Sequence, residues 1–376
     1  MKTALMRGAQ SVCALMLAMI FLLPGMAEAR NFSLRYSANV EGDLVLTGNM
    51  LLHCTDATTT CTAAKTGSST TATNRNLTMG PVDTDGDPST SISSGAYLTI
   101  PSGSTVLFAG LYWHGASSNA SRNQALFKTP TSFGYSVLTS STVDTLAGTG
   151  TSIPYQAYVD VTSMVAAGGS GTYWVAGVQA NSGVNSGTNF PVSGYEAGWS
   201  LVVVFSNNSY PLRNFAIYDG FLYTASGAIN ISVGGFLTPL SGPISTRLGS
   251  VVYDGDIDGT GDKLQLNGTD LTDALHTANN AFQGLITDLG VRMPGRNPSY
   301  NNTLGYDLAR WNIPSGLVAN GATNATITVV APTGTDDYLW PGVLTFATDI
   351  YVPIITPNIV KTATDKNGGD LVAGDT

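Results

Sequence analysis

The sequence predicts an all-β protein, organised as two consecutive β-sandwich or jelly-roll-like domains with very little helix. Runs of β-branched and aromatic residues, bounded by Gly, Asn, Asp or Ser, recur about every ten to fifteen residues. Charged residues make up only 11% of the chain, which is rich in Gly, Ser, Thr and Asn. Apolar patterns with a helical period are scarce. This combination is typical of turn-rich extracellular β-proteins.

Residues 1–29 have the pattern of a secretory signal peptide. A basic start at Lys2 precedes an apolar run over residues 12–23, and Ala27 and Ala29 place small residues before the cleavage point. No later segment offers about eighteen uncharged apolar residues in a row, so no membrane span is expected in the mature chain. We therefore expect an exported protein.

The first sandwich is expected over residues 30–210. Its first stretch, "LRYSANVEGDLVLTGN", alternates as a strand does, with turns expected at 41–43 and 48–49. "TVLFAGLYWHG", "GTYWVAGVQA" and "GWSLVVVFS" follow as strands. The apolar "LVVVF" has the composition of a buried strand, and the domain is expected to end after it.

The cysteines predict one disulfide. Cys13 lies in the leader, which leaves Cys54 and Cys61 as an even pair in an exported protein. The six polar residues between them are typical of a hairpin loop closed by a disulfide. A zinc site is not expected, because His53 adds only a third ligand and no second pair follows.

Helix is expected in two short places at most. Residues 159–169 form a candidate helix, with Asp160 or Thr162 as its N-cap and Gly168 as its stop. Residues 269–286 could hold another turn or two.

The second sandwich is expected over residues 211–352, where "NFAIYDGFLYTA", "AINISVGGFL", "RLGSVVYDGD", "KLQLNG", "ATITVVAPTG" and "VLTFATDIYVP" continue the strand pattern. Residues 353–376 begin with a Pro-rich linker and continue as a strand that stops at Thr376. About twenty residues cannot bury a core, so this strand is either truncated or in need of a partner.

The tail resembles the opening of the "domain of unknown function 11" repeat, an Ig-like sandwich found in tandem in bacterial surface proteins. The matching pieces are Pro357, "VKTATD" with Lys361 and Thr362, "NGGD" and "AGDT". The resemblance makes 353–376 a linker and the first, truncated strand of an Ig-like repeat. Residues 30–352 resemble the N-terminal region that often precedes such repeats, through "EGDLVLTGN" and the Cys pair, "AGLYWHGAS", "VDVTSMV", "GTYWVAGVQA", "AGWSLVVVFSN", "RNFAIYDGF" and "GDKLQLNG". This resemblance implies a modular protein of the cell envelope and implies no known reaction.

The stretch "DGDIDGTGD" is the strongest candidate metal site. Asp254, Asp256 and Asp258 occupy alternate positions before a glycine, as in the opening of a calcium loop, and Asp262 follows. Gln265 stands where an EF-hand has its bidentate Glu, and the flanks are strand-like, so an EF-hand is excluded. The open interpretations are a β-loop Ca²⁺ site, a polar turn and, least favoured, catalytic carboxylates.

A second acidic stretch, "DTDGDPS", carries Asp83, Asp85 and Asp87. Three like charges so close repel one another unless a cation or water screens them. We consider a weaker Ca²⁺ site and a solvated turn for this stretch.

No catalytic signature is present. The sequence lacks a nucleophile elbow, an H-E-x-x-H zinc motif, a P-loop and a dinucleotide-binding glycine pattern. Three histidines, His53, His114 and His276, are too few to indicate a site by themselves, and His114 next to Trp113 is expected to be packed. Glu196, just before a core strand, is the most interesting single carboxylate, although an ordinary loop residue is the simpler interpretation.

Two tryptophans are candidate sugar platforms. Trp311 and Trp340 lie nearer to loops than the tryptophans within apolar strands, although core packing is the simpler interpretation for both.

The leading hypothesis is a non-catalytic exported protein, the adhesin-like head or scaffold of a repeat-bearing envelope protein. Its partners would be other envelope components or host and matrix components, glycans among them. A Ca²⁺-assisted lectin is the second hypothesis, and a secreted polysaccharide hydrolase using Glu196 is the third. The formal net charge of −9 argues against nucleic acid as a partner.

Overall fold

The computed structural model describes residues 29–146, 151–184, 194–332 and 338–353. The predicted signal peptide, apart from Ala29, and the predicted Ig-like strand lie outside this part of the chain. The described residues form an all-β body, as the sequence predicted. No helix among them is long and apolar enough to cross a bilayer.

The largest sheet has eleven strands and is organised around the long strand β1 (Arg30–Met50). One flank, called the first flank here, consists of β11 (Ala197–Ser206), β5 (Thr105–Ala116), β9 (Pro154–Asp160) and β8 (Val143–Thr145). The other, the second flank, consists of β12 (Leu212–Phe221), β22 (Trp340–Asp349), β14 (Thr246–Tyr253), β20 (Tyr306–Asn312), β17 (Ile286–Asp288) and β18 (Val291–Arg292).

Strand β1 belongs to both flanks, because it changes partner halfway along its length. Residues 30–41 pair with β12, and residues 42–50 pair with β11. The Glu41 carbonyl accepts from Asn207 N at 2.7 Å, whereas the next amide, Gly42 N, donates to Pro211 O at 3.4 Å. These two groups belong to one trans peptide, whose C=O and N–H point to opposite edges of the strand, so the two partners lie on opposite edges of β1.

Two smaller sheets and a short ribbon complete the fold. The five-stranded sheet holds β19 (Arg296–Asn297), β4 (Ser93–Leu98), β10 (Gly171–Ala176), β6 (Gln124–Lys128) and β7 (Ser136–Thr139). The four-stranded sheet holds β13 (Gly227–Gly234), β21 (Asn324–Ala331), β15 (Lys263–Leu266) and β16 (Thr269–Asp270), and β2 (Leu52–Cys54) pairs with β3 (Met79–Pro81).

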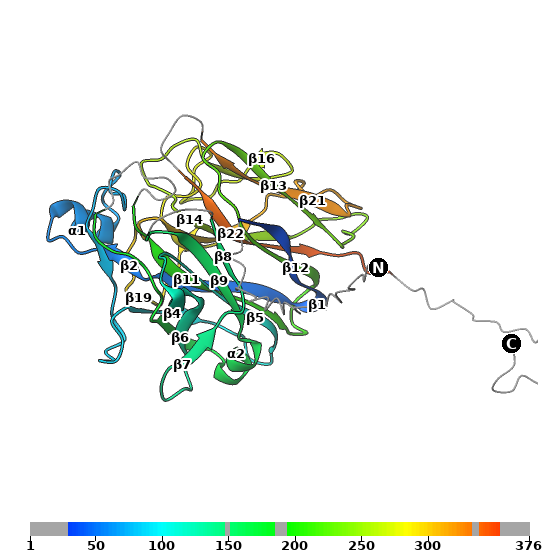
Figure 1. The fold of residues 1–376 in the computed structure, drawn as a ribbon. Helices are drawn as coiled ribbons and strands as arrows, with labels where there is room; N and C mark the ends of the chain where they lie inside the picture. The colour runs from blue at the N-terminus through cyan, green and yellow to red at the C-terminus, as the bar shows by residue number, and fades with distance from the viewer. Residues whose placement is uncertain (1–28, 147–150, 185–193, 333–337, 354–376) are drawn as a thin grey trace, which may run out of the picture.

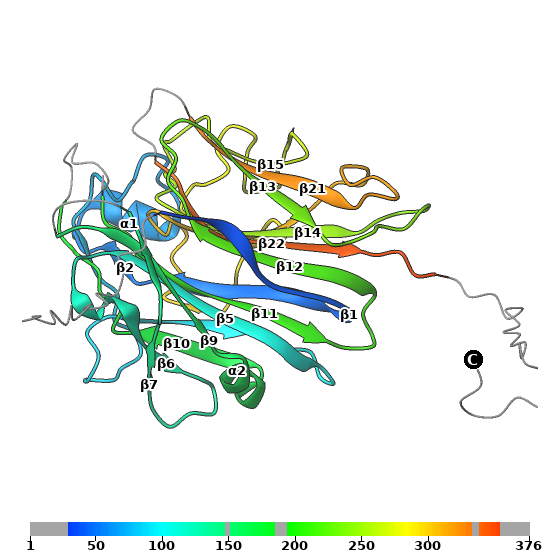
Figure 2. The same cartoon turned by 45° about the vertical axis from the view of Figure 1, so that its right-hand side comes forward.

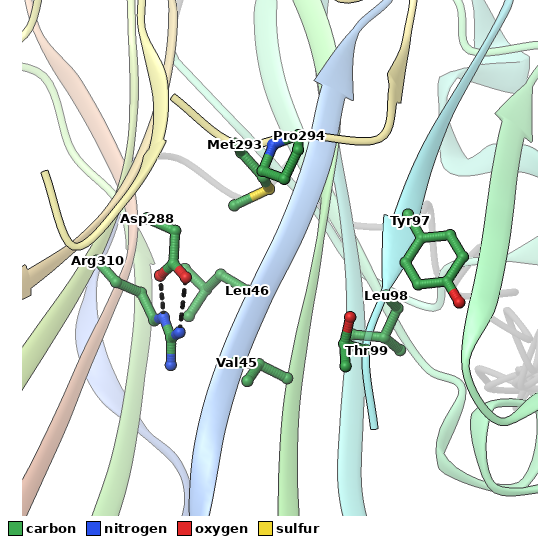
Figure 3. A pocket seen from close by; sticks show the side chains of 9 residues that line it. All are labelled: Val45, Leu46, Tyr97, Leu98, Thr99, Asp288, Met293, Pro294 and Arg310. Carbon is green, nitrogen blue, oxygen red and sulfur yellow. Dashed lines mark hydrogen bonds and ion pairs between the residues drawn. The ribbon is translucent and has the colours of Figure 1, made fainter. Parts of the chain in front are cut away.

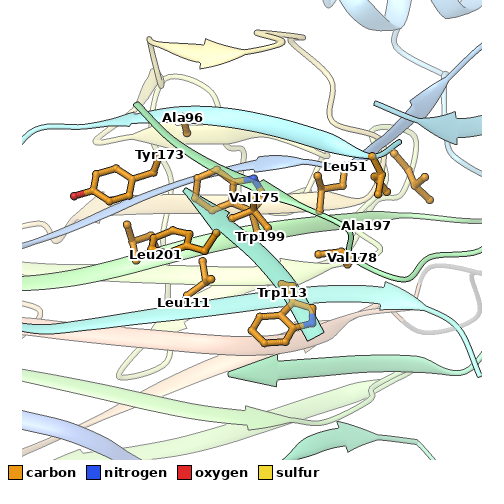
Figure 4. Packing of buried hydrophobic residues seen from close by; sticks show 14 of the residues in the cluster. Leu51, Ala96, Leu111, Trp113, Tyr173, Val175, Val178, Ala197, Trp199 and Leu201 are labelled. Atoms are coloured by element: carbon orange, nitrogen blue, oxygen red, sulfur yellow. The ribbon is translucent and has the colours of Figure 1, made fainter. Parts of the chain in front are cut away.

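Alternation along the central strands assigns the cores. In β11, Leu201 and Val203 point into a core shared with the five-stranded sheet, while Val202 and Val204 point into a core between the two flanks. A third core lies between the second flank and the four-stranded sheet. The layers therefore stack as four-stranded sheet, second flank, first flank and five-stranded sheet, the order seen in Figures 1 and 2. Figure 4 shows the first core, with Trp113, Tyr173 and Trp199 at its centre.

The two flanks approach each other closely. Gly198 permits this, since a Cβ there would lie 2.4 Å from the Tyr306 ring of the second flank. Polar groups also bridge the flanks: Tyr112 Oη donates to Asp219 Oδ2 at 3.1 Å, and Tyr253 Oη donates to Gln156 Oε1 at 2.7 Å. The boundary expected near residue 210 lies at the turn at 207–211, but the sheets cross it, because residues 30–41 of β1 pair with β12 and β19 pairs with β4.

The turns expected within the first strand are absent from the structure. Turns were expected at 41–43 and 48–49, but β1 runs without interruption from Arg30 to Met50. The glycine at 42 marks the change of partner instead. A Cβ at Gly42 would lie 2.0 Å from the Phe205 carbonyl oxygen, so the glycine is explained by the close approach of β11.

The helices differ from expectation in two of three places. Helix α2 (Thr162–Gly168) lies within the expected range, and Asp160 Oδ1 accepts from Thr162 N at 2.8 Å. Residues 269–286 form turns and short bridges rather than helix. Helix α1 (Thr59–Thr66) was not expected: Thr58 caps its N-terminus and Gly67, with φ 74°, ends it. The remaining helical turn is the 3₁₀ segment Ala120–Asn123.

The Cys54–Cys61 disulfide is confirmed, but its setting is not a hairpin loop. It connects the end of β2 to the first turn of α1, with both cysteines buried.

Candidate functional site

The four aspartates of "DGDIDGTGD", in the loop between β14 and β15, do not surround a common point. Asp254 faces Asn74, whose Nδ2 donates to its Oδ1 at 3.1 Å. Asp256 and the more exposed Asp258 both pair with Arg75, at 3.2 and 3.4 Å. Asp262 turns the other way and accepts the backbone N–H of Ala281. The expectation that all four aspartates ligate one ion is therefore not met.

Two of these aspartates instead join Glu196 in a buried cluster, called the acid centre here and defined by Asn74, His114, Glu196, Asp254 and Asp256. Glu196 precedes β11, His114 lies on β5 and Asp254 follows β14, so both flanks contribute. Asn74 Nδ2 bridges Glu196 Oε2 at 3.2 Å and Asp254 Oδ1. His114 Nε2 lies 2.9 Å from Glu196 Oε1. All five side chains are at most 4% exposed.

Burial raises the pKa of the carboxyls in the acid centre. It raises the pKa of Glu196 to about 8, although hydrogen bonds from the backbone and Asn74 act in the opposite direction. The pKa of Asp254 is raised well above its usual range by burial and by the neighbouring Glu196. For Asp256, burial and the charge of Asp254 raise the pKa, against the effect of Arg75. The acid centre thus favours the protonated form of Glu196 at neutral pH, and burial opposes ionisation of all three carboxyls.

His114 complements the protonated Glu196. Burial lowers the pKa of the His114 imidazole to about 3, against a raising contribution from a backbone hydrogen bond to Tyr155. The ring also stacks on Tyr253, with centroids 3.8 Å apart. A neutral imidazole beside a neutral carboxylic acid needs no ion pair, because a single hydrogen bond joins His114 Nε2 and Glu196 Oε1, with the donor set by the tautomer of the ring.

The acid centre has two oxygens with no hydrogen-bond partner among the described residues, Asn74 Oδ1 and Asp256 Oδ1. Buried oxygens of this kind are what a Ca²⁺ ion would use. However, the centre of the aspartate loop is already filled, because Asn280 Nδ2 donates to the carbonyls of Asp256, Ile257 and Gly259. Any ion would have to sit on the Glu196 side, and calcium binding there stays a prediction.

Within the described ranges, the only group of three or more acidic, His or Cys side chains whose ligand atoms all lie within 4.8 Å of one another is His53, Cys54 and Cys61. Both sulfurs form the disulfide. This group is therefore no calcium site, and the carboxylates of the acid centre would have to move closer together to bind an ion.

Asp83, Asp85 and Asp87 lie in a partly exposed turn before β4 and are held by hydroxyls and amides. Ser93 Oγ donates to Asp83 at 2.8 Å, Tyr135 Oη donates to Asp85, and Ser89 Oγ donates to Asp87 at 2.7 Å. Burial raises the pKa of Asp85, but these hydrogen bonds outweigh it and leave the pKa lowered. These contacts favour the solvated-turn interpretation, and a Ca²⁺ site here stays a prediction.

Trp311 and Trp340 are not available as sugar platforms. Each is 1% exposed. The Trp311 indole donates to Ser250 Oγ at 3.1 Å, within the core under the four-stranded sheet. Trp340 packs between the flanks against Phe221 and Tyr223. Their proximity to loops in the sequence was misleading, because each lies on a central strand whose two faces are both covered.

The other two histidines are packed, as is His114. His53 Nε2 contacts the Asn302 carbonyl at 2.9 Å, and burial lowers the pKa of His53 to about 4. His276 Nδ1 lies 2.8 Å from Asp273 Oδ1. The sequence had singled out Glu196, Asp254 and Asp256 separately. It gave no signal that Asn74 joins them, since Asn74 lies in an ordinary polar stretch 122 residues before Glu196.

Comparisons with known proteins leave the family open. No protein-family model and no curated protein matches this sequence. Among solved structures, the chain is similar to the major capsid protein P2 from bacteriophage PM2, at 9% identity over 82% of this chain and 98% of that chain. The TM-score is 0.20, so the likeness carries no argument about fold or function.

Proposed function

We propose that this chain is a non-catalytic, exported protein of the bacterial surface, serving as the adhesin-like head or scaffold of a repeat-bearing envelope protein. The Cys54–Cys61 disulfide carries the proposal, since disulfides persist in oxidising compartments outside the cytoplasm. The pair is buried at the contact between β2 and α1, where it contributes to the fold. The resemblance of the sequence to envelope proteins supports the same conclusion.

The four-layer architecture also supports a scaffold role. The central strands are covered on both faces, and buried polar groups join the layers at places such as Tyr112 and Asp219. Such a body presents long, rigid edges and loops to its surroundings. Its partners would be other envelope components or host and matrix components.

The lectin hypothesis and the hydrolase hypothesis receive less support from the structure. A lectin built on Trp311 and Trp340 lacks its platforms, since both indoles are buried. A polysaccharide hydrolase would need a substrate to reach Glu196, which is 3% exposed. The raised pKa of Glu196 is what a general acid requires, yet burial of the carboxyl explains it without catalysis.

Export can be tested by producing the full chain in a bacterial host and separating periplasm from cytoplasm. We expect an exported form whose intact mass corresponds to a chain beginning at Arg30, with Cys54 and Cys61 oxidised. The control is Leu17→Arg, which interrupts the apolar run of the leader and should keep the chain in the cytoplasm with free thiols. An unprocessed wild-type chain that stays in the cytoplasm would overturn the proposal.

A further inference from the structure

A pocket of about 190 Å³ lies beside β1, away from the acid centre. Figure 3 shows Val45 and Leu46 of β1 at its base, on opposite sides of the strand, with Leu98 at the end of β4 and the following Thr99 on the Val45 side. Met293 and Pro294 close one end, Tyr97 stands at the β4 side, and Asp288 and Arg310 stand across β1 from it. Pockets for drug-sized ligands measure roughly 300–1,000 Å³, so this one fits a single small ring.

The polar wall of the pocket is a fixed ion pair. Arg310 donates through Nε to Asp288 Oδ1 at 2.5 Å and through Nη2 to Oδ2 at 2.9 Å. Its Nη1 donates to the Leu44 carbonyl at 2.5 Å, which ties the guanidinium to β1. Arg310 is 8% exposed. Three of its five N–H donors are used, which leaves two, and the Asp288 oxygens keep unused lone pairs.

This pair offers a donor and an acceptor side by side at no net charge. Asp288 and Arg310 are the only charged residues of the nine that line the pocket, and each neutralises the other. Two neighbouring hydroxyls match this arrangement, because one can donate to the carboxylate while the other accepts from the guanidinium. A neutral ligand is favoured, since either sign of charge would meet an already satisfied counter-charge.

The aromatic side of the pocket is Tyr97. Its side chain is 47% exposed although it lies on a strand of the five-stranded sheet. Its backbone is fixed by two hydrogen bonds: Tyr97 N donates to the Gly295 carbonyl at 3.0 Å, and Thr47 Oγ1 donates to the Tyr97 carbonyl at 3.0 Å. An exposed ring on a fixed backbone can pack against the C–H face of a sugar with little loss of freedom.

We propose that this pocket binds a neutral pyranose sugar, with Tyr97 against the ring and the Asp288–Arg310 pair on two vicinal hydroxyls. The apolar floor of Val45, Leu46 and Leu98 accommodates the remaining C–H groups. This adds glycan binding to the proposed envelope role and requires neither calcium nor the acid centre. A failure to bind sugar would therefore leave the proposal of export untouched, and a failure of export would leave the proposal of sugar binding untouched.

The test is saturation-transfer NMR on the oxidised full chain, with methyl β-D-glucopyranoside, methyl β-D-galactopyranoside and methyl α-D-mannopyranoside as probes. We expect transfer to the ring C–H protons of at least one glycoside. Tyr97→Ala should weaken that binding about tenfold, the effect of removing an aromatic anchor, and Asp288→Asn should weaken it as well. The matched control is Phe133→Ala, which removes a fully exposed aromatic ring near β7 and should leave binding unchanged.

Circular dichroism of each variant separates loss of the pocket from loss of the fold. The methyl glycoside of glucuronic acid, added as an anionic probe, should bind more weakly than its neutral counterpart. The proposal is overturned if none of the three neutral glycosides receives saturation, if folded Tyr97→Ala binds like wild type, or if the anionic sugar binds more tightly.

Discussion

At the scale of single residues, the protonation of Glu196 links the acid centre to the stability of the protein. The carboxyl has a pKa of about 8 in the folded protein and an ordinary value of 4.5. The folded state therefore holds a proton that the unfolded chain releases, so this contribution to stability is complete below pH 4.5 and is lost as the pH rises through 8. The lowered pKa of His53 and His114 acts in the opposite direction, but only below their ordinary value of 6.5.

We expect the free energy of unfolding to fall between pH 6.5 and 8, where the histidines no longer contribute. One proton accounts for up to about 2 kcal/mol over this interval, at about 1.4 kcal/mol per pH unit. Glu196→Gln should remove the part of the slope that its one proton contributes and leave any part from Asp254 and Asp256, whereas Glu41→Gln, at an exposed position, should leave the slope unchanged. Denaturant unfolding at the two pH values measures this. An unchanged slope in Glu196→Gln would show that Glu196 is already ionised in the folded protein.

Calcium would reverse this preference by stabilising the ionised carboxyls of Glu196, Asp254 and Asp256. An ion that binds only the folded state adds about 2.7 kcal/mol at a hundred times its dissociation constant. We expect excess Ca²⁺ to raise the melting temperature relative to chelator, and Asp256→Asn to abolish the rise. Asp258→Asn is the matched control, because Asp258 also pairs with Arg75 but lies outside the acid centre. Equal melting temperatures with Ca²⁺ and chelator in wild type would leave these carboxyls as proton-binding groups.

The composition of the acid centre shows what sequence can and cannot predict about a site. Spacing drew attention to Asp254 and Asp256, and the position before a core strand drew attention to Glu196. The directions of the side chains were not predictable, because they follow from how β5, β11 and β14 meet across the two flanks.

At the scale of elements, the disulfide is the clearest source of local stability. It holds the short helix α1 on β2, and a helix of eight residues has little stability of its own. We expect the double variant Cys54→Ala, Cys61→Ala to lose about 2 kcal/mol of stability, because the closed loop is short. Thermal unfolding of the variant should match that of wild type under reductant. A variant as stable as the oxidised protein would show that packing alone holds α1.

The central strands are the elements that the local sequence pattern predicted correctly. Apolar β-branched runs predicted the central strands β5, β11, β12 and β22, since a strand covered on both faces is apolar throughout. Helix α1 escaped notice because "TTCTAAKT" carries a threonine-rich pattern without a long apolar stripe. The expected helix at 269–286 failed because Asp273 and other polar side chains cap turns there.

At the scale of the whole molecule, β1 makes the two sandwiches depend on each other. The sequence predicted an all-β sandwich fold, but no local pattern shows that residues 30–41 pair with a strand of residues 211–352. The pairing spans about 180 residues of chain and is visible only in the fold. Asp219 adds to the dependence, since it is fully buried against Arg30 and Arg35 of β1.

We therefore expect residues 211–352 alone to lack a stable fold. Without β1, the edge of β12 is open, and the inner residues Phe215, Ile217 and Val343 lose the first flank that covers them. Size-exclusion chromatography and thermal unfolding should show aggregation without a cooperative transition, whereas residues 30–352 should be monomeric and cooperative. Co-expression of residues 30–210 with 211–352 should restore a soluble complex, because the two pieces then carry both halves of the shared sheet. A folded, monomeric 211–352 fragment would mean that β1 is an accessory strand rather than the element that joins the two sandwiches.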